Sequence, residues 1–86
     1  MLLVKDFING HLKTANSIDS DADITSRKIQ TPARTQYLSW LREQAQIHRD
    51  YAKTLETTFD VNQQADIDLV TSNWVEFSSA KRNNSY

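Results

Sequence analysis

The sequence predicts an all-α fold: a small three-helix bundle in which an N-terminal helix is followed by a helical hairpin with one long central helix. First, residues 31–59 separate polar from apolar side chains at the helical period, which is hard to obtain by chance. Second, shorter apolar stripes with the same period lie on either side of that segment. Third, the chain holds one glycine and one proline in 86 residues, so few positions interrupt a helix.

The long central helix is predicted over residues 32–58. Thr31 can accept a hydrogen bond from an early backbone N–H, and Pro32 suits the first helical position, where an N–H is not needed. At 1.5 Å per residue this helix is roughly 40 Å long. A compact chain of this size has a radius of gyration of about 12 Å. The helix is therefore expected to form the spine of an elongated bundle or to project toward another chain.

An N-terminal helix is predicted within residues 1–18, because Val4, Phe7, Ile8 and Leu12 recur at helical spacing from residue 3 onward. The pair Asn9-Gly10 is also a signal for a β-hairpin that would join residues 5–8 to residues 11–15. We favour the helix because residues 11–15 lack the β-branched run of a second strand.

Residues 19–31 are predicted to form a linker, since their acids and serines and the following proline discourage a long regular element. Asp19, Asp21 and Asp23 open a D-x-D-x-D pattern typical of calcium loops. That pattern also requires a glycine and a bidentate glutamate, and Ile24 and Gln30 stand at those positions. No metal ligands are therefore predicted.

A C-terminal helix is predicted over residues 61–80. Asp60, followed three residues later by Gln63, is typical of a helix N-terminus. The apolar stripe of this helix consists of Ile67, Val70, Trp74 and Phe77. The alternative is a hairpin of residues 66–70 and 74–78, which the β-branched and aromatic residues favour.

Size and composition predict a single small domain over residues 1–86, with residues 81–86 as a tail. Apolar residues make up 38% of the chain, below the usual 45–50% or so, so the core is thin and a partner or a second copy would add stability. The absence of cysteine excludes disulfides and thiol nucleophiles. No apolar run approaches the roughly 20 residues of a membrane span. Lys5 and Asp6 come too early for a secretory signal, so a location in the cytoplasm or within an assembled particle is expected.

Charge is unevenly distributed although the net charge is only −1. Residues 1–26 carry two lysines and four aspartates, residues 27–53 carry six basic and two acidic residues, and residues 54–86 carry two basic and five acidic residues. We expect the acidic flanks to fold back and neutralise the basic middle, since opposite charges attract over the short distances in a small bundle.

Catalysis is not expected, and no catalytic residue or cofactor is predicted. One glycine in the chain excludes a phosphate-binding glycine loop. His11 and His48 do not have the spacing of a zinc motif. His48 is expected to be partly buried and hydrogen-bonded to a neighbour; alternatively, it sets the register or the oligomeric state of a helical interface.

A basic stripe is predicted on the long helix, where Arg42, Gln46, Arg49 and Lys53 share one side. Such a stripe can follow a phosphate backbone, so a nucleic-acid-associated regulatory protein that uses residues 27–53 is the alternative function. Glu43 and Asp50 flank the stripe and would repel phosphates.

The favoured function is a non-enzymatic protein–protein interaction module: an adaptor, an inhibitor or a small assembly subunit. Short, cysteine-free helical chains of this kind are frequent among phage and mobile-element proteins. Aromatic residues dominate both cores and interface hot spots. The expected partner is another protein or a second copy of the chain, without a membrane. The residues predicted to contact it are Tyr37, Trp40, Tyr51, Trp74, Arg42, Arg49 and Lys53.

Overall fold

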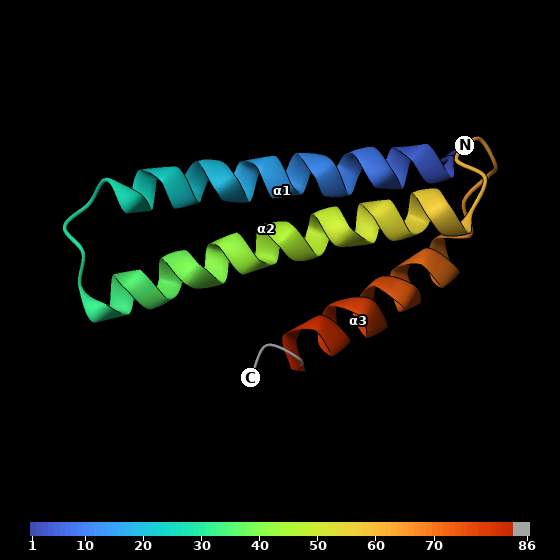
Figure 1. Cartoon of the computed structure of the whole chain (residues 1–86). Helices are drawn as coiled ribbons and strands as arrows, with labels where there is room; N and C mark the ends of the chain where they lie inside the picture. The colour runs from blue at the N-terminus through green and yellow to red at the C-terminus, as the bar shows by residue number, and fades with distance from the viewer. Residues whose placement is uncertain (84–86) are drawn as a thin grey trace.

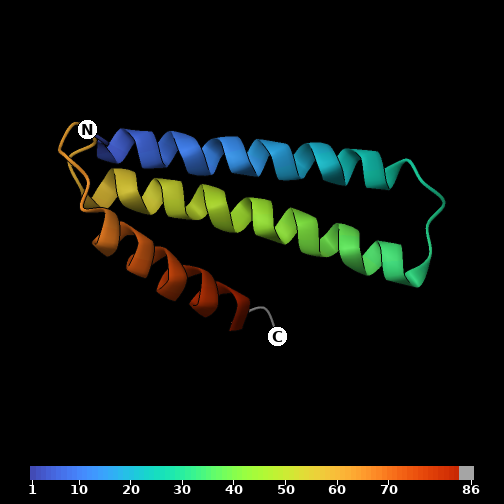
Figure 2. The ribbon, with the colours of Figure 1, turned by 180° about the vertical axis from the view of Figure 1, so that it is seen from behind.

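A computed structural model describes residues 1–83 and shows three α-helices: α1 (Val4–Ser26), α2 (Pro32–Thr58) and α3 (Ile67–Asn83). Helices α1 and α2 lie side by side in opposite directions, and α3 turns back along α2 (Figure 1). The view from behind shows that α3 lies beside only the C-terminal half of α2, at the end of the molecule that holds the N-terminus of the chain (Figure 2). Within residues 1–83 no strand forms, and one isolated bridge pairs Leu3 with Gln64. The predicted all-α class is confirmed.

Helix α2 is the unbroken central helix that the sequence predicts, with the same first and last residues. Thr31 Oγ1 accepts a hydrogen bond from Arg34 N–H at 3.2 Å, and Pro32 occupies the first turn. The helix ends where Phe59 becomes extended and donates its N–H to the Leu55 carbonyl at 3.0 Å. Because both ends depend on residues close in sequence, local signals sufficed to predict them.

Helix α1 is longer than predicted, so the predicted linker 19–31 is wrong for residues 19–26. Ala15, Ala22 and Thr25 continue one buried stripe at helical spacing. That stripe packs against α2, whose Ala45 and Ala52 let the two helices approach closely. Packing therefore keeps the acidic segment helical, and the linker shrinks to residues 27–31. The alternative hairpin of residues 5–8 and 11–15 does not form.

Helix α3 begins at Ile67, so the predicted start at residue 61 is wrong. Residues 61–65, which we call the clasp, bond instead to the start of the chain. Val4 N–H donates to the Gln63 carbonyl at 3.0 Å, and Lys5 N–H donates to the Val61 carbonyl at 2.9 Å. The first N–H groups of a helix have no acceptor within the helix, and the clasp supplies the carbonyl acceptors for two of them in α1.

The N-terminal cap of α3 is Asp66, six residues after the one that the sequence suggested. Asp66 Oδ1 accepts a hydrogen bond from Leu69 N–H at 3.1 Å, whereas Asp60 Oδ1 accepts one from Asn62 within a turn. The alternative hairpin of residues 66–70 and 74–78 does not form. Residues 81–83 of the predicted tail belong to α3, and residues 84–86 lie outside the described residues.

The core lies at the end of the molecule that holds the N-terminus. It joins buried side chains of all three helices and the clasp: Val4, Ile8, Tyr51, Ala52, Leu55, Ala65 and Val70. Yet within the described residues no Cα atom of α1 lies within 8 Å of one in α3, so these two helices meet through side chains alone. The radius of gyration is 14.7 Å and the extents are 46 × 25 × 18 Å, which makes the molecule elongated, as expected from α2.

Candidate functional site

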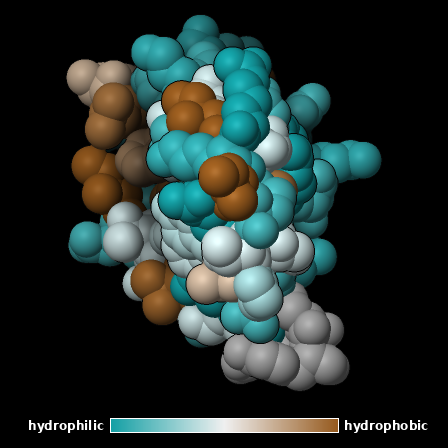
Figure 3. Space-filling view, turned by 90° about the vertical axis from the view of Figure 1, so that its left-hand side faces the viewer, coloured by the Kyte–Doolittle hydropathy of each residue, from teal (hydrophilic) through white to brown (hydrophobic). Residues whose placement is uncertain are grey.

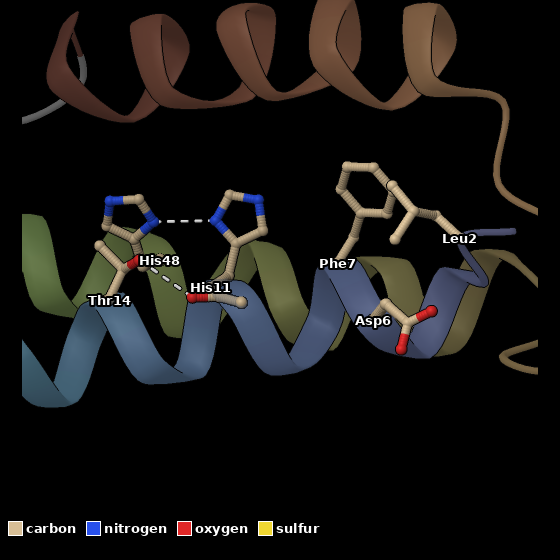
Figure 4. Close-up of a pocket in the computed structure, with 7 residues that line it drawn as sticks. Leu2, Asp6, Phe7, His11, Thr14 and His48 are labelled. Atoms are coloured by element: carbon tan, nitrogen blue, oxygen red, sulfur yellow. Dashed lines mark hydrogen bonds between the residues drawn. The ribbon is translucent and has the colours of Figure 1, made fainter.

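The most distinctive side-chain arrangement is the histidine cluster, formed by His11 of α1, His48 and Tyr51 of α2, and Trp74 of α3. The two imidazoles point toward each other across the α1–α2 seam, with Nδ1 atoms 2.9 Å apart (Figure 4). Trp74 stacks on His48 at 4.5 Å between ring centroids and lies 4.8 Å from His11. Tyr51 meets His11 edge-on at 5.0 Å. Three helices therefore converge on one group of aromatic rings.

Helical spacing brings these residues together. His11 comes three residues after Ile8 and four before Ala15, so it shares the stripe of α1 that faces α2. His48 follows Ala45 by three residues and Trp74 follows Val70 by four, which places each ring beside a buried neighbour. The prediction that His48 is partly buried and hydrogen-bonded is confirmed. Its partner His11 was not predicted, although the position of His11 on the apolar stripe is a signal for it.

Both histidines are neutral at pH 7. Burial, and secondarily the neighbouring His48, lowers the pKa of His11 to about 4. Burial, and secondarily the Arg82 guanidinium, lowers the pKa of His48. One Nδ1–H therefore donates to the lone pair of the other Nδ1, and the two rings adopt opposite tautomers.

A cavity of about 320 Å³ opens beside the pair, lined by Leu2, Asp6, Phe7, Gly10, His11, Thr14 and His48. Its lining is mostly apolar, with Leu2 and Phe7 at one end and the imidazoles at the other (Figure 4). The Asp6 carboxylate turns away from the rings, and its Oδ2 accepts a hydrogen bond from Leu3 N–H at 2.8 Å. Within residues 1–83 no three potential metal-binding side chains gather in one place.

Two of the aromatic residues predicted to contact a partner belong to the interior. Tyr51 is completely buried, and its hydroxyl donates to the Val70 carbonyl at 2.9 Å. Burial also raises the pKa of the Tyr51 phenol. Trp74 is partly buried within the histidine cluster. In this structure Tyr51 is inaccessible to another molecule, because α3 covers it.

Tyr37 and Trp40, which we call the distal aromatic pair, are instead uncovered. Each is 51% exposed, and their rings stack at 6.1 Å with an interplanar angle of 17°. Tyr37 lies seven residues before Gln44 and fourteen before Tyr51, so the three share one face of α2. Arg82, near the end of α3, donates to Gln44 Oε1 at 2.9 Å. The pair therefore continues the face that α3 covers, beyond the point where α3 ends.

The end of the hairpin near the pair is otherwise polar. Figure 3 views the molecule from this end and shows separate brown, hydrophobic patches among teal, hydrophilic side chains. Ile24 is 53% exposed, and it lies nine residues after Ala15, on the side of α1 turned away from α2. Exposed aliphatic residues here are thus scattered, whereas the two aromatic rings form one ordered surface.

The basic stripe is largely neutralised. Arg49 forms an ion pair with Asp19 and donates to Asn16 Oδ1 at 3.2 Å. Arg42 lies 3.9 Å from Asp23. Both partners belong to α1, so the expectation that the acidic N-terminal flank neutralises the middle is confirmed for these two arginines. Lys53 is exposed.

No protein-family model, curated protein or solved structure matches this chain. Within the described part, none of the helices has the length and apolar character to cross a membrane. The function is therefore inferred from the arrangement of the side chains themselves.

Proposed function

We propose that this chain is a non-enzymatic protein–protein interaction module, a small assembly subunit that binds a second copy of itself through the distal aromatic pair. The observation that carries the proposal is the stacked, half-exposed Tyr37–Trp40 pair on the otherwise α3-covered face of α2. Nothing in the described residues covers this part of the face.

The energetics favour aromatic rings as docking anchors. Tyr and Trp carry large apolar surfaces, and each Å² removed from water contributes about 25 cal/mol. Because Tyr37 and Trp40 already stack on each other, little side-chain entropy is lost when a partner covers them. Residues of these two types are also the commonest hot spots of interfaces.

The geometry of α2 makes a second copy the fitting occupant. A two-fold axis across α2 beside the pair would set two α2 helices antiparallel, with each pair against the other. Each α3 covers only the half of its α2 that lies away from the axis, so the third helices would remain at opposite ends of the dimer. A net charge of −1 per chain gives little repulsion between copies.

If the partner is a second copy of the chain, the role that fits best among adaptor, inhibitor and assembly subunit is the assembly subunit. An adaptor or an inhibitor needs a surface matched to a different protein, and the arginines of the basic stripe are less available for that, because Arg42 and Arg49 are already paired with aspartates of α1. An apolar pair on a two-fold axis, by contrast, is complementary to itself.

The test is light scattering of the purified chain across a concentration series, with Trp40→Ala and Tyr37→Ala as variants. We expect the wild type to form dimers and each variant to dissociate at a concentration at least about tenfold higher, because an aromatic hot spot contributes more than about 1.4 kcal/mol. Ile24→Ala is the matched control, since Ile24 has a similar exposure at the same end but faces away from α2. We expect it to leave the dimer unchanged.

Two results would overturn the proposal. One is a wild type that stays monomeric at about 100 µM, a concentration at which a dimer with a Kd of about 1 µM is almost fully formed. The other is a dimer that Trp40→Ala and Ile24→Ala weaken equally. Circular dichroism of each variant establishes that the helices persist, so a loss of dimer is not mistaken for unfolding.

Nucleic-acid association through residues 27–53 is the second candidate function. Phosphates would have to compete with Asp19 for Arg49 and with Asp23 for Arg42. That function requires binding to a mixed DNA and RNA pool at low salt, and the binding must weaken with added salt and with Arg42→Ala or Arg49→Ala.

A further inference from the structure

The attachment of α3 depends on side chains. No Cα atom of α1 lies within 8 Å of one in α3 in the described residues, so α3 meets α1 through side chains such as Trp74. Trp74 touches His11, His48 and Tyr51, with ring centroids 4.8, 4.5 and 5.3 Å away. The histidine cluster is thus one of the places where α3 is joined to both helices of the hairpin, next to the core that holds Val70.

The hydrogen bond within the cluster limits how many protons the pair can hold. In the neutral pair, one imidazole donates its Nδ1–H and the other accepts at Nδ1. A first added proton enters at Nε2 of the donor ring, and the bond persists. A second proton must enter at Nδ1 of the acceptor ring, where the bond already lies. Two N–H groups would then face each other over 2.9 Å with like charges, so the rings must separate.

The groups around the pair do not offset such a charge. From α1, Asp6 lines the same cavity, but its carboxylate turns away from the rings and is bound by Leu3 N–H. From α2, the Tyr51 phenol and the Gln44 amide are neutral. From α3, Trp74 is neutral, and the Arg82 guanidinium, held on Gln44, adds a positive charge.

We propose that the His11–His48 pair is an acid-sensitive latch, which holds α3 on the α1–α2 hairpin while at most one proton is added and releases α3 when both rings are protonated. Separation of the rings removes the surface on which Trp74 stacks. The hairpin itself persists, because α1 and α2 pack through Ala15, Ala22, Ala45 and Ala52 along their shared length. Release would uncover Tyr51 and Leu55, which extends the apolar face of α2 from the distal aromatic pair toward the C-terminal end of that helix.

Release of α3 and formation of the dimer do not depend on each other. The distal aromatic pair lies beyond the end of α3, so a monomer can release α3 and a dimer can form with α3 in place. The latch is tested at concentrations where light scattering finds only monomer, so neither failure implies the other.

The test follows Trp74 fluorescence during acid titration of the full chain. The sequence has two tryptophans, so Trp40→Phe leaves Trp74 as the only one. We expect Trp74 emission to shift to the red between pH 6.5 and 4, as water reaches the indole. Far-UV circular dichroism should fall by no more than the contribution of α3, because the hairpin remains.

The matched control replaces both imidazoles. His11→Gln with His48→Gln keeps a pair of side chains that can hydrogen-bond but cannot take up a proton. Carboxylates titrate in the same way in both proteins. We expect the Trp74 transition of the double variant to move down by at least about one pH unit or to disappear. An unchanged midpoint would refute the latch.

Nuclear magnetic resonance of the wild type decides the question even if the double variant does not fold. We expect the two imidazole Cε1–H signals to titrate in separate steps below pH 6.5 and the Trp74 indole signal to move with the second step. If both rings titrate together at pH 6.5 and the indole signal does not move, the pair is not a latch.

Discussion

Gly10 is the residue of α1 with the least intrinsic preference for its helix, and nothing in its surroundings demands it. A Cβ atom built at Gly10 meets no atom within 4 Å. Its φ is not positive, so the backbone does not require glycine either. Glycine inside a helix costs about 0.5–1 kcal/mol relative to alanine, mainly because the unfolded chain has more freedom.

Gly10→Ala is therefore expected to raise the free energy of unfolding by about 0.5–1 kcal/mol. Urea denaturation measures the change as a higher midpoint at constant slope. Lys13→Ala, another exposed position of α1, is the comparison and should stay within about 0.5 kcal/mol of the wild type. A loss of stability in Gly10→Ala would mean that the cavity lined by Gly10 holds something that a methyl group displaces.

For a single residue, the sequence predicts whether the side chain is buried better than it predicts which side chains it contacts. The apolar position of His48 predicts a partly buried, hydrogen-bonded ring, which the structure confirms. The pattern of one helix does not say which helix lies opposite, so His11 was not identified as the partner. Tyr51 and Tyr37 occupy the same face of α2, and only the length of α3 decides that the first is covered and the second is not.

Ion pairs between α1 and α2 differ in their protection from solvent. The side chains of Arg49 and Asp19 are 34% and 35% exposed, whereas those of Arg42 and Asp23 are 52% and 63% exposed. Water and salt screen the more exposed pair more strongly, and exposed pairs usually contribute a few tenths of a kcal/mol.

A double-mutant cycle with Asp19→Asn and Arg49→Gln is expected to give a coupling energy of about 0.5–1 kcal/mol. The same cycle at Asp23 and Arg42 is the internal control, with an expected coupling near zero. Both cycles use urea denaturation, and the first coupling should shrink at about 0.5 M salt. Equal couplings for the two pairs would show that exposure does not distinguish them.

The ends of the three helices differ in how far the sequence determines them. Both ends of α2 follow from nearby residues, and both were predicted correctly. The extension of α1 to Ser26 depends on packing against α2 and on the Asp19–Arg49 pair, which a local pattern does not contain. The local pattern predicts the start of α3 too early, because residues 61–65 bond to the start of the chain, more than 55 residues away.

For the whole molecule, the lowered histidine pKa values make stability depend on pH. The pKa of His11 is about 4 in the folded chain, against 6.5 for a free imidazole. Between these values the unfolded chain binds more protons, so stability rises with pH. The stability due to neutral His11 is fully present above pH 6.5 and is lost as the pH falls toward 4.

After a discount for a half-exposed ring, the loss between pH 7 and pH 4.5 is expected to be about 1–2 kcal/mol. Urea denaturation at several pH values measures it. The double variant with glutamine at positions 11 and 48 should lose less over the same range. A wild type that is as stable at pH 4.5 as at pH 7 would show that its histidines are not perturbed.

The sequence predicts the fold class, the length of α2 and the separation of its polar from its apolar side chains, because helical period and capping are local properties. The wide separation of the α1 and α3 backbones cannot be predicted in this way, since it depends on how far α3 reaches and on which face of α2 it occupies. The candidate site follows the same division: Trp40 was identified as a possible anchor, but its exposure depends on where α3 ends.

The clasp has a consequence for the order in which the protein assembles during translation. Val4 and Lys5 are synthesised before the clasp, yet the carbonyl groups that receive their N–H bonds belong to Gln63 and Val61. The first turn of α1 must therefore wait for residues 61–63 to be made before its backbone is fully paired. Residues added ahead of Met1, such as an affinity tag, would join the chain at this late-closing junction.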